Sequence, residues 1–98
     1  MAQVGGVVAA GWEAVRDAFV NNLENSEEVG AGVSVYHRGN KVVDLWGGSF
    51  DAEKTQPYVE DTLQLVFSTT KGITAIAVAM CVERGLLSYD EKVSTYWP

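Results

Sequence analysis

The sequence feature that most constrains the fold is an apolar segment, residues 73–82, in which Thr74 is the only polar residue. The segment is followed by Glu83, Arg84 and Gly85. An Arg in the last helical turn and a Gly just beyond it are common signals for the end of a helix. A helix with apolar side chains on every face must be surrounded by protein. The segment therefore predicts a buried helix at the centre of a globular domain.

Three other regular elements are predicted, and all of them lie upstream. Residues 12–23 form an amphipathic helix, because apolar side chains recur there at every third or fourth position. Residues 33–37 and 41–46 have the alternating pattern of half-buried strands. Gly39 and Asn40 lie between the strands, and a Gly in first position suits a two-residue type II′ turn. The sequence thus predicts one amphipathic helix followed by a β-hairpin.

These elements are too few to surround an apolar helix. Residues 51–61 are polar and contain Pro57, so they are expected to form an exposed loop, and no domain boundary is expected there. We therefore expect the chain to be truncated. Residues 1–98 would be the N-terminal portion of one larger domain.

The composition argues against several classes of function. The formal net charge is −6, and Lys and Arg do not cluster, so nucleic acid is not an expected partner. Cys81 is the only cysteine and His37 the only histidine, so we expect chemistry without a metal or other cofactor. No apolar run approaches the roughly 20 residues of a membrane span, and residues 1–10 lack the basic start of a signal peptide. The expected location is cytoplasmic, without a membrane partner.

Ser68 and Lys71 are the candidate catalytic residues. They are three positions apart at the start of the predicted apolar helix, where side chains at this spacing share a face with Cβ atoms about 5–6 Å apart. A lysine amine desolvated by apolar neighbours can be neutral and accept a serine proton. Free N–H groups at the amino end of a helix stabilise negative charge, and the N–H of Ser68 would form half of an oxyanion hole.

A purely structural interpretation competes with this one. Ser68 or Thr69 would cap the helix through its hydroxyl group, and Lys71 would be solvated on the first turn. This alternative explains Ser68 well. It explains Lys71 poorly, because a lysine is electrostatically unfavourable near the positive end of a helix dipole.

Several motifs occur in the order found in a known family. Residues 61–72, DTLQLVFSTTKG, resemble the first motif of the β-lactamase-related serine hydrolases, which include class C β-lactamases, carboxylesterases and D-amino-acid-specific peptidases. Residues 30–35 and 43–48 are similar to the first hairpin of that family. Residues 84–87 and 90–93 are similar to the stretch that follows its active-site helix. The resemblance covers residues 12–98.

This resemblance implies an α+β chain with the β-lactamase/transpeptidase-like fold, an antiparallel sheet with flanking helices. It implies that Ser68 attacks an ester, amide or β-lactam carbonyl of a small-molecule substrate to form an acyl-enzyme, with Lys71 as the base. The family's second and third motifs, Tyr-x-Asn and Lys- or His-x-Gly, normally lie beyond residue 98. We therefore expect residues 1–98 alone to be inactive. The alternative is a non-catalytic domain of this family with a structural or partner-binding role.

Overall fold

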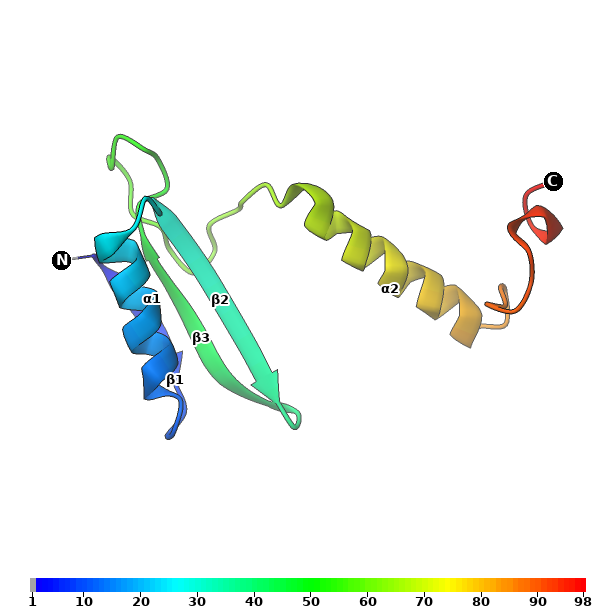
Figure 1. Ribbon diagram of the computed structural model, residues 1–98, viewed down its shortest axis with the longest axis horizontal. Coiled ribbons are helices and arrows are strands. Elements are labelled where there is room, and N and C mark those ends of the chain that lie inside the picture. Colours follow the sequence, from blue (N-terminus) through cyan, green and yellow to red (C-terminus); the bar gives the residue numbers. More distant parts are fainter. Residues whose placement is uncertain (1) are drawn as a thin grey trace. The chain divides into compact units, whose positions relative to one another are not determined.

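The computed structural model describes residues 2–98, which divide into two compact units (Figure 1). The first unit extends to Leu63, and the second is Gln64–Pro98. The chain combines a small antiparallel sheet with helices, as the α+β prediction requires.

The first unit contains a three-stranded sheet in the order β1-β3-β2. Its strands are β1 (Val4–Val8), β2 (Gly30–His37) and β3 (Asn40–Gly48), and β3 pairs antiparallel with both neighbours. Helix α1 (Glu13–Asn25) lies along the sheet and contacts β1 and β3 (Figure 1). The predicted first helix and hairpin are therefore confirmed, although each element is longer than its apolar pattern.

The hydrophobic core of the first unit is centred on β3. Val43 and Leu45 are fully buried, and Val42 is buried as well. Side chains of α1 and of the neighbouring strands pack against them: Val4, Val8, Ala9, Trp12, Val15, Phe19, Val33 and Val35. Burying one aliphatic side chain stabilises a fold by about 1.5–3 kcal/mol. The alternation that predicted the second strand thus also marks the core.

The turn of the hairpin differs from the prediction. His37 pairs with Asn40, so the two-residue loop is Arg38-Gly39 rather than Gly39-Asn40. Both loop residues have positive φ, 52° for Arg38 and 80° for Gly39, as a type I′ turn requires. The predicted type II′ turn was therefore wrong in position and in type. Gly39 is the second residue of the turn and adopts its left-handed conformation readily. Arg38, the first residue, also adopts a left-handed conformation because the strand register fixes the loop length.

Strand β1 was not predicted from the sequence. Its residues, VGGVV, lack the alternation of a half-buried strand, and Gly6 has a φ of 96° that few other residues adopt. The strand is formed by pairing with one edge of β3, from Val4 opposite Gly47 to Val8 opposite Val43. Long-range hydrogen bonding, rather than local preference, therefore determines this element.

The second unit is built around the apolar helix. It contains the 3-10 turn η1 (Phe67–Thr69), helix α2 (Thr70–Glu83) and the short η2 (Val93–Thr95). The helix ends as predicted: Gly85 has a φ of 71°, its N–H donates to the Val82 carbonyl at 3.0 Å, and the Leu86 N–H donates to the Cys81 carbonyl at 2.9 Å. This pair of bonds is a Schellman motif, which satisfies two carbonyl groups at the helix end.

The second unit by itself does not bury this helix. No residue of α2 is buried, and Ile73 and Ile76 are 64% and 59% exposed. The predicted helix is confirmed, but its predicted burial is not provided by the part of the chain that the structure describes. Within residues 2–98, no helix is both long enough and apolar enough to span a membrane.

Candidate active site

Both predicted catalytic residues lie at the start of the apolar helix. Ser68 is the central residue of η1, and Lys71 is the second residue of α2. The chain between them is helical, with φ, ψ of −57°, −25° at Thr69 and −54°, −28° at Thr70. Helical residues three positions apart have Cβ atoms about 5–6 Å apart, and in a 3-10 turn they lie nearly in line. Ser68 and Lys71 therefore lie on the same side of this helical segment.

The structural alternative is supported only in part: Lys71 is exposed, as that alternative expects, but the capping bond is absent. The N-cap residues are Val66 for η1 and Thr69 for α2, and neither makes a side-chain capping bond. Neither the Ser68 hydroxyl nor the Lys71 amine makes a hydrogen bond or an ion pair within residues 2–98. The Ser68 hydroxyl is therefore not engaged in satisfying the helix terminus.

The backbone before Ser68 is unusual. Val66 has φ −112° and ψ 5°, and Phe67 has a positive φ of 44°. The first hydrogen bond of the following turn runs from the Thr69 N–H to the Val66 carbonyl, at 3.0 Å, and the Thr70 N–H donates to the Phe67 carbonyl. The Ser68 N–H precedes these bonds at the positive end of the helical segment, where negative charge is stabilised. The sequence carries no signal for this conformation, since an aromatic residue rarely adopts a positive φ.

His37 and Cys81 are two other residues with distinctive side-chain chemistry. The ring centroid of His37, at the end of β2, is 5.8 Å from that of Trp12, with the rings tilted by 54°. Cys81 is a partly buried free thiol on α2. Among residues 2–98, no group of three or more His, Cys, Asp or Glu side chains is placed to bind a metal ion.

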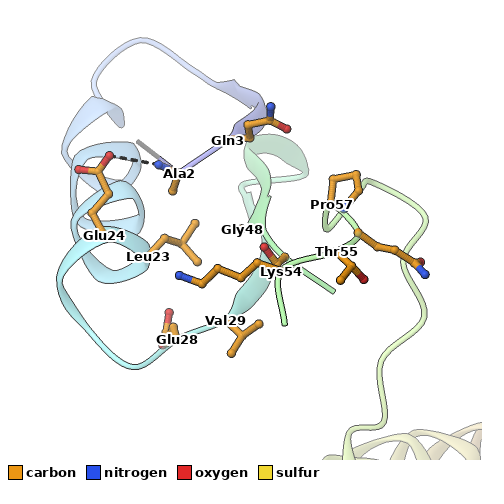
Figure 2. A pocket seen from close by; sticks show the side chains of 12 residues that line it. Ala2, Gln3, Leu23, Glu24, Glu28, Val29, Gly48, Lys54, Thr55 and Pro57 are labelled. Atoms are coloured by element: carbon orange, nitrogen blue, oxygen red, sulfur yellow. Dashed lines mark hydrogen bonds between the residues drawn. The ribbon is translucent and has the colours of Figure 1, made fainter. Parts of the chain in front are cut away.

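A cavity of about 700 Å³ is present in the first unit (Figure 2). It lies between Ala2 and Gln3, the end of α1 and the loop after β3, and its lining includes Glu24, Glu28 and Lys54. The Ala2 N–H donates to a Glu24 carboxylate oxygen at 3.3 Å at its edge. All of its lining residues belong to the first unit.

Comparisons with known proteins identify relatives over most of the chain. The family model described as Beta-lactamase matches residues 15–98. Esterase/beta-lactamase LipL of Mycobacterium tuberculosis is 37% identical over 81 residues, which are 83% of this chain and 19% of that protein. Esterase EstB of Burkholderia gladioli is 37% identical over 80 residues, which are 82% of this chain and 20% of that protein.

A solved structure agrees with these relatives. The crystal structure of a family VIII carboxylesterase matches 98% of this chain with a TM-score of 0.92 and 42% sequence identity, and the match covers 26% of that protein. The chain thus spans about a fifth to a quarter of the length of the relatives it matches. The resemblance drawn from the sequence motifs is confirmed, and the chain belongs to the beta-lactamase family.

Proposed function

We propose that residues 1–98 are the N-terminal portion of a single β-lactamase-like domain, and that the full-length protein is a serine hydrolase. Ser68 is the nucleophile and Lys71 is the base. The observation that carries the proposal is the pair itself: a serine and a lysine three residues apart at a helix start, in a chain of this family. The substrate is an ester, amide or β-lactam, and the esterase names of the relatives favour esters.

The reaction proceeds through an acyl-enzyme. The Ser68 Oγ forms a bond to the carbonyl carbon while its proton passes to the Lys71 Nζ, and the carbonyl electron pair moves onto oxygen. When the oxyanion collapses, the C=O bond reforms and the C–O or C–N bond to the leaving group breaks. The leaving group takes the proton from Lys71. Water then attacks the acyl group in the same way, which releases the acid and restores Ser68.

The local backbone supports the charge that develops in this sequence of steps. The oxyanion requires N–H donors that are already oriented, because reorienting them during the reaction would cost free energy. The Ser68 N–H, which precedes the first hydrogen bond of η1, supplies one such donor.

The proposal is tested by labelling the full-length protein with a fluorophosphonate probe. We expect labelling in the parent, no labelling in Ser68→Ala, and parental labelling in Ser88→Ala, a control at an exposed serine of the same unit. Undiminished labelling of Ser68→Ala would disprove the nucleophile assignment. A parent that is folded but neither labelled nor active would instead favour the non-catalytic domain.

A further inference from the structure

Strand β1 forms one edge of the three-stranded sheet, and no other strand among residues 2–98 pairs with its outer side. Just before the strand, the Gln3 carbonyl accepts a hydrogen bond from the Gly48 N–H of β3 at 3.0 Å. The backbone groups of successive residues point to opposite sides of an extended chain. Because Gln3 faces β3, its neighbours Ala2 and Val4 direct their backbone groups outward, away from the sheet.

Side chains of helix α1 occupy both of these outward-facing positions. The Arg16 Nη2 donates to the Val4 carbonyl at 3.5 Å, in a partly buried contact. The Ala2 N–H donates to a Glu24 carboxylate oxygen at 3.3 Å. One cationic donor and one anionic acceptor of the same helix therefore take the hydrogen-bonding positions that a further strand would use.

The residues of β1 itself do little to prevent such a strand from adding. The sequence of the strand, VGGVV, contains no charged residue and no proline, and Val7 is 68% exposed. Lysine and proline are the residues that commonly protect edge strands from pairing with other chains. Short apolar strands without charge or proline pair readily with copies of themselves. Protection of this edge must therefore come from outside the strand.

We propose that Arg16 and Glu24 close the outer edge of β1 to a second copy of this chain. An incoming strand would have to displace both side chains from the backbone groups that they bind. A second copy is the partner that fits, because two identical strands can pair antiparallel about a two-fold axis, so that each outward N–H of one copy meets a carbonyl of the other. The inference concerns the first unit and does not depend on the chemistry of Ser68.

Two other roles for these side chains make different predictions. If Arg16 and Glu24 only fasten β1 to α1, removing them lowers the stability of the strand but leaves the association state unchanged. If they act only through net charge, removing both has no effect on association, since the loss of one positive and one negative charge leaves the formal charge at −6.

The experiment compares the full-length parent with the double variant Arg16→Met/Glu24→Met by sedimentation velocity, over concentrations of about 1–100 µM. Methionine keeps an unbranched apolar stem but cannot form either charged hydrogen bond. We expect the double variant to self-associate at least about tenfold more tightly than the parent. The control is Arg38→Met/Glu53→Met, which removes the same two charges at exposed positions and should associate as the parent does.

A third substitution shows whether the association uses this edge. Adding Val7→Lys to the double variant places a charge on β1 at an exposed position, which should return association to the parental level. An association state unchanged by Arg16→Met/Glu24→Met, or association that survives Val7→Lys, would overturn the inference. If the double variant does not fold, Arg16→Met alone, which retains the bond between Glu24 and Ala2, decides it by the same comparison.

Discussion

Gly6 of β1 and Asp44 of β3 approach so closely that a Cβ atom on Gly6 would lie 1.9 Å from the Asp44 carbonyl oxygen. Gly6 also has a φ of 96°. Both constraints exclude side chains at this position, because a contact under 3.0 Å forces the backbone to move and a positive φ strains L residues. The pairing of β1 with β3 therefore depends on Gly6.

We expect Gly6→Ala to weaken or detach β1, lowering the stability of the full-length protein by about 1–3 kcal/mol or more. Thermal melting and protease cleavage near the N-terminus measure the effect. Gly11→Ala is the matched control, because Gly11 has a φ of 88° but a Cβ atom at this position would meet nothing within 4 Å. Equal losses in the two variants would show that backbone strain alone, and not contact with Asp44, limits this position.

Lys71→Arg is expected to lower kcat for ester hydrolysis about 100-fold or more, the contribution typical of a general base. Arginine keeps the positive charge but does not lose a proton at usable pH, so it cannot accept the proton of Ser68. The melting temperature should remain close to that of the parent. Lys92→Arg, at another exposed lysine of the second unit, is the control and should keep full activity. Near-parental turnover of Lys71→Arg would rule out the base role.

Asp51 organises the loop that follows β3. Its carboxylate accepts hydrogen bonds from the Thr55 hydroxyl and from the N–H groups of Thr55 and Gln56, at 2.8 and 3.2 Å for the two amides. These bonds, led by the Thr55 hydroxyl, lower the pKa of Asp51 below its usual value of 3.8. A lowered pKa means that the folded loop favours the charged carboxylate, so the stabilisation is complete above the unfolded pKa and is lost as the pH falls through the folded value.

An NMR titration tests this assignment. The amide signals of Thr55 and Gln56 should shift together with a midpoint below 3.8, and the shift should be absent in Asp51→Asn. Asp90→Asn, at an exposed aspartate of the second unit, should leave the midpoint unchanged. A midpoint at or above the ordinary value for an aspartate would show that the loop hydrogen bonds do not favour the carboxylate.

The sequence predicted those elements of the fold whose own residues carry a recognisable pattern. Periodic apolar residues located α1 and α2, and Gly85 located the end of α2. Strand β1 has no such pattern because it is held by pairing with β3, and the hairpin turn was misplaced by one residue because register, not turn preference, fixed its position.

The candidate site also has one part that the sequence predicted and one part that it did not. Spacing and motif pointed to Ser68 and Lys71, and the structure places both at the start of the apolar helix. The conformation of Phe67 could not be predicted, because it contradicts the preference of an aromatic residue. The residue type at position 67 therefore carries no signal of its conformation, whereas Gly85 at the helix end does.

The last prediction concerns residues 1–98 expressed alone. The first unit has a buried core at Val43 and Leu45, whereas α2 has no buried residue and exposes Ile73 and Ile76. Ordering a residue costs roughly 1–2 kcal/mol of backbone entropy, and a helix that buries little apolar surface does not offset that cost. In hydrogen exchange, the amides of β3 should therefore be protected more strongly than those of α2. Thermal melting should be broad, and ester hydrolysis should not exceed background. Equal protection in both units, a single sharp transition and turnover that requires Ser68 would show instead that these residues form a complete catalytic domain.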